Sequence, residues 1–200
     1  MILLAVDTSA GRGGIALWRD GHVVEKTLEA PDGFSHILFA EIEGFLAEHR
    51  VTPGGIDAFA AASGPGSFTG VRVALSAMKG LAEAFGRPLF AVSNLQALAW
   101  YGAGARRAAV LDARRGEIYG GLYDADLNLL GEETVTTRDA FLAALPRGAE
   151  VIEQRDSVVA AVARIAAARY LAGERPEPAA ADANYVRRSD AELKWTDPAA

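Results

Sequence analysis

A short run at the start of the chain constrains the fold most. Residues 2–6 are all apolar, and Asp7 follows them directly. A strand with one wet face alternates apolar and polar residues, so an unbroken apolar run predicts a strand buried on both faces. The run also lacks a basic flank and meets a charge too early for the core of a secretory signal. We therefore expect a buried strand in a soluble, cytoplasmic protein.

Strand-like and helical periods alternate along the first part of the chain. Clusters of Gly, Pro and Asp separate the segments, and their order predicts a βββαβα unit followed by one more short strand. Strands are expected at residues 2–6, 15–18, 22–28, 56–62 and 89–92, with helices at 34–46 and 69–85.

The second half repeats this theme less completely. An apolar strand again ends in aspartate, at Asp112, as the first strand does at Asp7. We interpret this as an internal duplication, with a first lobe over residues 1–92, a shortened second lobe over 93–190 and a tail over 191–200. In the second lobe we expect helices at 95–101, 137–145 and 157–171, strands at 108–111 and 117–123, a tether at 173–182 and a short element at 185–188.

Composition and spacing exclude several functional classes. None of the 200 residues is cysteine, which excludes thiol nucleophiles, zinc ribbons and disulfides. Lys and Arg total 20 against 26 Asp and Glu, and a chain of net charge −6 lacks the basic stripe that direct nucleic-acid binding needs. No two of the three histidines have the spacing of a helical metal site, and no Ser–His–Asp set can be assembled. We predict no metal site and no catalytic residues.

The string Asp7-Thr8-Ser9 is a first candidate site. It lies where a buried strand gives way to a turn. In phosphate-handling folds an aspartate there holds a metal–nucleotide complex while small hydroxyl residues touch phosphate. Alternatively, Asp7 only stabilises the turn, and Thr8 and Ser9 bond local backbone groups.

The most distinctive string is Gly-Pro-Gly-Ser-Phe-Thr-Gly-Val-Arg at residues 64–72. Its glycines permit sharp turns, a hydroxyl residue can cap the following helix, and the helix N-terminus offers N–H groups to an anion. The spacing fits neither a P-loop, nor the dinucleotide fingerprint, nor a nucleophile elbow. A rigid capped turn is the alternative. The residues that define this motif loop are Gly64, Gly66, Ser67, Thr69, Gly70 and Arg72.

Both helices of the first unit are apolar over more of their surface than one core contact requires. The polar stripe of the 69–85 helix is narrow, and the 34–46 helix is apolar over an arc of about 200°, against the roughly 100° that faces a core. Such helices bury a second face either inside a thick core or against another subunit. The candidate partner-binding residues are Ile37, Leu38, Ile42, Val73, Ala74, Ala77, Met78 and Leu81.

Four strings together resemble one family. Residues 7–9, 64–72, 92–95 and 112–119, in this order and spacing, are similar to the TsaB (YeaZ) family of bacterial tRNA threonylcarbamoyladenosine biosynthesis proteins. The resemblance covers about residues 1–125 and returns at residues 185–187, where Ala183 stands in place of the family's proline.

The resemblance implies a two-lobed actin-like ATPase (ASKHA, ribonuclease H-like) fold in the α/β class, built from a duplicated βββαβα unit. It also implies a non-catalytic partner of the TsaD subunit, which transfers threonylcarbamoyl to adenosine 37 of tRNAs reading ANN codons. A TsaE-type ATPase is a further implied partner, and self-association uses the same first-lobe surface. ATP, metal and tRNA would be held by the complex and not by this chain alone.

The nucleotide site implied by that fold is degraded in this sequence. Thr8 stands where a glycine normally follows the first aspartate, and Ala113 and Arg114 fill the matching turn after Asp112. We therefore interpret Asp7, Thr8, Ser9 and Asp112 as a vestigial nucleotide site. Two alternatives remain, a genuine ASKHA-type ATPase or small-molecule kinase and a glycoprotease-like peptidase.

Overall fold

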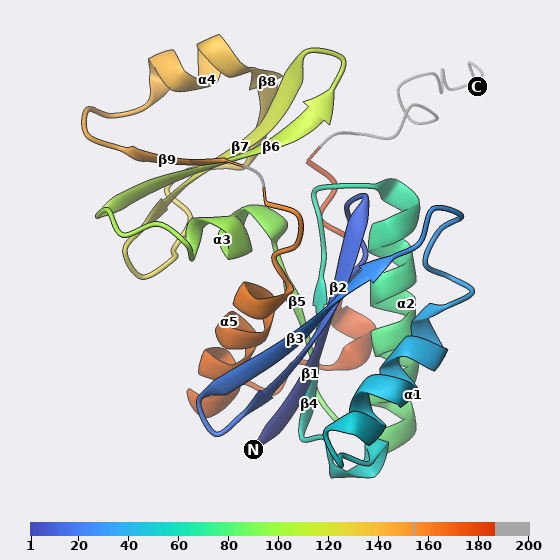
Figure 1. Cartoon of the computed structure of the whole chain (residues 1–200). Helices are drawn as coiled ribbons and strands as arrows, with labels where there is room; N and C mark the ends of the chain where they lie inside the picture. The colour runs from blue at the N-terminus through green and yellow to red at the C-terminus, as the bar shows by residue number, and fades with distance from the viewer. Residues whose placement is uncertain (154, 187–200) are drawn as a thin grey trace, which may run out of the picture.

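The computed structural model describes residues 1–153 and 155–186, which form two lobes, one above the other in Figure 1. The lower lobe is built on a five-stranded sheet in which the first two neighbouring pairs are antiparallel and the last two are parallel. Across this sheet the strand order is β3 (His22–Glu29), β2 (Arg12–Arg19), β1 (Ile2–Asp7), β4 (Ala58–Ala62) and β5 (Leu89–Val92).

The central strand β1 is buried on both faces, as its apolar run predicts. Leu3 and Ala5 belong to one hydrophobic core, whereas Leu4 and Val6 belong to the other. This alternation follows from the period of two in a strand, which sends successive side chains to opposite faces. The prediction of an α/β fold with a doubly covered sheet is confirmed.

Helices cover the two faces of this sheet. On one face lie α1 (Leu38–Glu48) and α2 (Phe68–Phe85), and on the other lies α5 (Val159–Leu171), as Figure 1 shows. α1 starts four residues later than its apolar spacing suggested, because residues 34–37 form a hydrogen-bonded turn around the Phe34 carbonyl. No described helix is long and apolar enough to cross a lipid bilayer.

The upper lobe repeats the order βββαβα with a smaller sheet. Its strand order is β8 (Thr134–Thr137), β7 (Glu117–Asp124), β6 (Arg106–Arg114) and β9 (Glu150–Glu153). α3 (Asn94–Ala99) packs on one face and α4 (Arg138–Ala144) on the other. The sequence-based assignment missed β8 and β9, because each has only four residues and neither has an alternating pattern long enough to detect. The sheet matches β3-β2-β1-β4 of the lower lobe and lacks a counterpart of β5.

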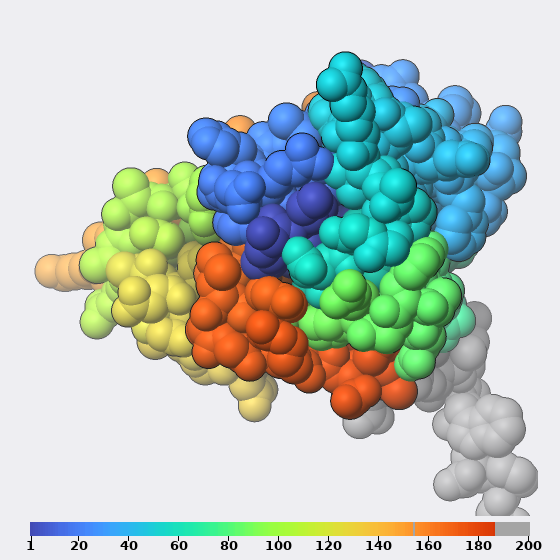
Figure 2. Space-filling view, turned by 90° about the horizontal axis from the view of Figure 1, so that it is seen from below, coloured from blue at the N-terminus to red at the C-terminus, as the bar shows by residue number. Residues whose placement is uncertain are grey.

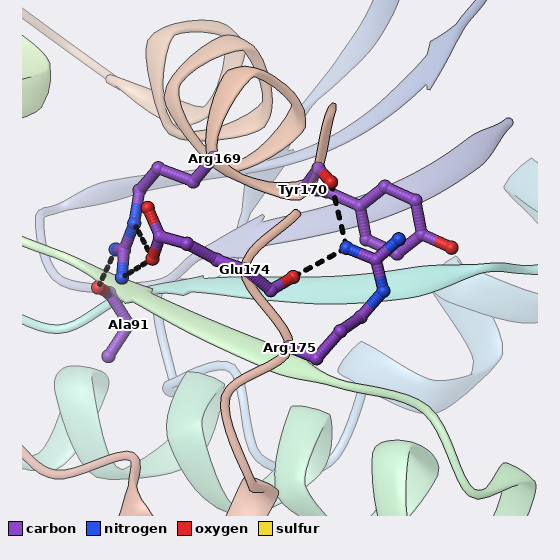
Figure 3. A network of polar contacts seen from close by, with 5 residues as sticks. All are labelled: Ala91, Arg169, Tyr170, Glu174 and Arg175. Atoms are coloured by element: carbon purple, nitrogen blue, oxygen red, sulfur yellow. Dashed lines mark hydrogen bonds and ion pairs between the residues drawn. The ribbon is translucent and has the colours of Figure 1, made fainter. Parts of the chain in front are cut away.

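The last helix of the second unit belongs to the first lobe in space. α5 packs against all five strands of the lower sheet, although the linear division at residue 92 assigned it to the second lobe. Seen from below, its orange surface adjoins the dark blue start of the chain (Figure 2). At its end Arg169 pairs with Glu174 at 2.8 Å and donates to the Ala91 carbonyl of β5, while Arg175 stacks on Tyr170 (Figure 3).

Candidate functional site

A cavity of about 790 Å³ lies where the motif loop meets the upper lobe. The end of β1, the turn between β6 and β7, the segment 155–158 and the last described residues, 184–186, also line it. The cavity thus brings together Asp7, Ser9, part of the motif loop and Asp112, whereas Thr8 of the predicted vestigial site does not line it.

Asp7 is the most tightly held group in this cavity. Its side chain is 1% exposed. One carboxylate oxygen accepts from the Ser9 backbone at 2.9 Å and the Ser9 hydroxyl at 2.6 Å, and the other accepts from the Ser157 hydroxyl at 3.3 Å and the Val158 backbone at 3.2 Å. A carboxylate has about four lone-pair positions, so these four donors occupy all of them. Asp7 therefore ties the end of β1 to the start of α5.

The motif loop lies directly on the end of β1. The Thr8 hydroxyl donates to the Gly70 carbonyl at 2.7 Å, and the Ser67 N–H donates to the Ser9 carbonyl at 2.7 Å. A Cβ on Gly70 would lie 1.9 Å from the Thr8 carbonyl oxygen, so no side chain fits there. Gly66 and Gly70 have no positive φ, but the neighbouring backbone lies too close to them for a Cβ. Gly64 has a φ of +99°, which favours glycine.

Of the two hydroxyl residues at the start of α2, Ser67 and Thr69, only Ser67 caps the helix. The Ser67 side chain accepts from the Gly70 N–H at 3.3 Å, and Ser67 is the N-cap residue. Among the described residues no hydrogen bond involves the Thr69 side chain, which instead lines a groove beside α1. The structure therefore contains a capped turn at the start of α2, and Ser67 is its N-cap.

Asn94 is a central residue of this junction; it belongs to the 92–95 string, but the sequence analysis gave it no role. Its amide nitrogen donates to the Ser9 hydroxyl at 2.6 Å and the Pro65 carbonyl at 3.1 Å, and its oxygen accepts from the Gly64 N–H at 3.1 Å. It is 3% exposed. Its place at the start of α3, just after an apolar strand, was the available signal.

Glu133 is a second residue missed from the sequence. Its carboxylate accepts from Ser93 at 2.5 Å, from the Asn184 amide at 2.5 Å and from the Tyr123 hydroxyl. Burial and the nearby carboxylate raise the pKa of Tyr123 well above that of an ordinary phenol. Glu133 thereby joins β7, α3 and the C-terminal strap, which we define as residues 178–186.

Asp112 does not repeat the environment of Asp7. It is exposed, and it accepts from the Arg114 N–H at 2.7 Å within its own turn. Arg114 and Arg115 both have left-handed φ values, of 62° and 58°. The two aspartates share a position in the repeat and a cavity, but only Asp7 is built into the core.

These residues do not fit a magnesium–nucleotide complex of the kind that the actin-like ATPase fold holds. The four internal donors occupy the lone pairs with which Asp7 would bind a metal-bound water. The Thr8 side chain, bonded to the Gly70 carbonyl, fills the place where the main chain would have to approach a phosphate. In residues 1–153 and 155–186 no group of three His, Asp or Glu side chains is arranged to hold a metal ion.

Most of the candidate partner-binding residues lie inside the lower lobe. Leu38, Ile42, Ala74 and Met78 are at most 4% exposed and Ala77 is 6% exposed, because α1 and α2 pack on the sheet and on each other's apolar sides within one core. These five are thus largely buried in the core of the lobe itself, although Leu38 and Ala77 also line a groove between the two helices, and their contact with a second subunit stays a prediction. Ile37, Val73 and Leu81 are only partly buried.

A different apolar surface is exposed beside them. Phe39 of α1 is 57% exposed and Phe68 of α2 is 45% exposed, and both line a groove of about 490 Å³ between these helices. We call it the α1–α2 groove. Its lining residues are Ser35, Leu38, Phe39, Phe68, Thr69, Arg72, Val73, Ser76 and Ala77.

Comparison with known proteins places the chain in a family. The family model described as TsaD, tRNA N6-adenosine threonylcarbamoyltransferase, matches residues 28–154. The chain belongs to the TsaD family. Its similar relatives include the tRNA threonylcarbamoyladenosine biosynthesis protein TsaB of Escherichia coli, 36% identical over 67% of this chain, and that of Bacillus subtilis, 34% identical over 72%. The resemblance to TsaB is thus confirmed.

The extent of these matches differs between sequence and structure. The chain covers 61% and 63% of the lengths of the two TsaB relatives. The solved structure of YeaZ from Pseudomonas aeruginosa superimposes with a TM-score of 0.77 at 27% identity, covering 92% of this chain and 99% of that one. The two-lobed fold is therefore that of YeaZ.

Proposed function

We propose that the chain is a non-catalytic partner subunit of a TsaD-type transferase. In this role it supports N6-threonylcarbamoylation of adenosine 37 in tRNAs reading ANN codons. The Asp7 carboxylate carries the non-catalytic part of the proposal, because it would have to release internal donors before it could bind a metal or act as a base. Similarity to the TsaB proteins supports the reaction.

The exposed α1–α2 groove supports binding to the transferase subunit. Two phenylalanines that are about half exposed on adjacent helices are typical of an interaction surface. A TsaE-type ATPase, ATP and metal belong to the same proposed assembly on other subunits, and tRNA reaches this chain only through that assembly. We further propose that the complex works in the cytoplasm and that the isolated chain can pair with itself.

Reconstitution tests this proposal. The transferase subunit, a TsaE-type ATPase, tRNA and the activated threonylcarbamoyl donor are combined with and without this chain, and modified adenosine is measured by mass spectrometry of nucleosides. We expect modification to require the chain and to survive Asp7→Asn at a temperature well below the melting point of that variant. Full modification without the chain would contradict the proposal.

A genuine ATPase or small-molecule kinase is the second candidate, favoured by the size of the cavity that holds Asp7 and Asp112. It requires Asp7 to release its internal donors. The peptidase alternative has no residues to carry it among those the structure describes.

A further inference from the structure

A cluster of arginines and aromatic rings lies beside α5, away from the α1–α2 groove. The guanidinium carbon of Arg155 is 4.1 Å from the centre of the Tyr101 ring. That of Arg164 is 5.4 Å from the centre of the Trp100 ring, and the two rings are 5.1 Å apart, edge to face. These contacts join the end of α3 to the segment 155–158 and to α5. We call Trp100, Tyr101, Arg155 and Arg164 the Trp100 patch.

The two guanidinium groups of this patch have no protein acceptor. Within the part of the chain that the structure describes, neither Arg155 nor Arg164 donates a hydrogen bond or forms an ion pair. Arg169 and Arg175, at the far end of α5, are instead engaged in an ion pair and in bonds to backbone carbonyls (Figure 3). A guanidinium that stacks on a ring keeps the N–H groups at its edge available to a ligand. The patch therefore offers two ordered cations to an anion.

The patch also exposes an aromatic surface. Trp100 is 37% exposed, although proteins bury most of the surface of an average tryptophan. One acid lies nearby, since burial raises the pKa of Tyr101 and the carboxylate of Glu25 on β3 raises it further. Glu25 forms no ion pair with either arginine of the patch. The two positive charges are thus left for a ligand, and Glu25 weakens their field without cancelling it.

We infer that the Trp100 patch contacts the tRNA when this chain is part of the transferase complex. Arg155 and Arg164 bind backbone phosphates, and the exposed surface of Trp100 stacks on an unpaired base. Aromatic rings and arginine planes beside phosphate contacts are what proteins use to hold single-stranded segments of RNA. The inference rests on the proposed function, because that assembly supplies the RNA.

The place of the patch in the fold favours RNA over the transferase subunit as its ligand. α5 covers one face of the lower sheet, whereas α1 and α2, whose groove we assign to the transferase subunit, cover the other (Figure 1). One copy of the chain can therefore contact both at once. The chain carries a net charge of −6, so two cations do not make it a tRNA-binding protein on its own. They add to the affinity of the assembly.

Fluorescence-anisotropy titration of labelled tRNA with the complex of this chain and the transferase subunit tests the inference. For the double variant Arg155→Met, Arg164→Met we expect Kd for tRNA to rise about tenfold. The slope of log affinity against log salt should fall by about 1.5–2, because two phosphate contacts are lost. Trp100→Ala should raise Kd about tenfold with an unchanged slope, since stacking carries no charge. Glu25→Gln should lower Kd about twofold, because a negative charge beside the patch is removed.

Two further variants separate these effects from general charge and from packing. Arg147→Met, exposed on the upper lobe and outside the patch, removes the same charge and should leave Kd and the slope unchanged. Trp100→Phe keeps an aromatic ring and should retain most of the affinity. Titrations are run well below the lowest melting temperature in the series, so that any loss of stability does not enter Kd.

Each outcome has one meaning. Wild-type affinity for tRNA in the double arginine variant, or an equal loss in Arg147→Met, would overturn the inference while leaving the proposed function intact. So would a complex that binds tRNA no more tightly than the transferase subunit alone. Calorimetry measures binding between the two proteins separately, and weaker binding in the double variant would assign the patch to a protein partner and overturn the inference. Failure of the wild-type chain to bind the transferase subunit would instead overturn the proposed function.

Discussion

The two lobes share an order of elements but differ in how they are held together. The lower sheet has five strands and a core on each face, whereas the upper sheet has four strands and an outer core of only four buried residues, Ala108, Val110, Ile118 and Phe141. The inner face of the upper sheet shares the core that contains α3 and α5. One face of the upper sheet is therefore buried against the lower lobe.

The polar residues follow the same contrast. Asp7, at the end of the first repeat's leading strand, is buried and bonded on all sides, whereas Asp112, at the matching place in the second, is exposed. In the first repeat this carboxylate holds the start of α5 onto the sheet through Ser157 and Val158.

The largest expected effect comes from adding a side chain where the motif loop lies directly against the end of β1. Gly70→Ala should lower the free energy of unfolding by about 3 kcal/mol, because its Cβ would overlap the Thr8 carbonyl. Gly80→Ala, on the same helix with open space around it, should raise the free energy of unfolding by up to about 1 kcal/mol. Urea denaturation of both variants provides the measurement, and equal effects would mean that the close approach does not exist.

The pair of aspartates gives the next largest contrast. Asp7→Ala leaves the donors of Ser9, Ser157 and Val158 without an acceptor, so we expect a loss of about 2–3 kcal/mol in the free energy of unfolding. Asp112→Ala should cost about 1 kcal/mol or less because the side chain is exposed. Hydrogen exchange should show α5 opening earlier only in Asp7→Ala. Equal costs for the two would contradict the difference between the repeats.

Much of this arrangement was predictable from local pattern. The apolar run before Asp7 and the helical spacing before Phe85 fixed the first unit to within a few residues, because burial on both faces and capping by Ser67 leave strong local signals. No local pattern predicts which of the two sheets α5 packs against, since an Ala-rich helix can pack on either one. The buried state of Leu38 and Met78 also depends on which helices meet, which one sequence does not specify.

The hydrogen bonds to Glu133 give a smaller effect that sharpens the link between the lobes. Tyr123→Phe should lower the free energy of unfolding by about 1.5 kcal/mol at neutral pH, because a hydrogen bond to a charged group is lost. The pKa of Tyr123 is raised in the folded chain, so the wild type should also lose stability as the pH rises above about 10, where the unfolded chain gives up this proton. In Tyr123→Phe that alkaline loss should shrink. Thermal melts between neutral and alkaline pH measure both, and an unchanged alkaline slope would contradict the assignment.

Titration of Mg·ATP into the isolated chain tests the central claim most directly. The claim is that the carboxylate of Asp7 is an internal tie, so that the chain has kept the ATPase fold without its nucleotide site. Isothermal calorimetry should then detect no binding up to millimolar nucleotide, and no phosphate should be released. Micromolar binding together with hydrolysis that disappears in Asp7→Ala would contradict the account and establish this chain as an ATPase.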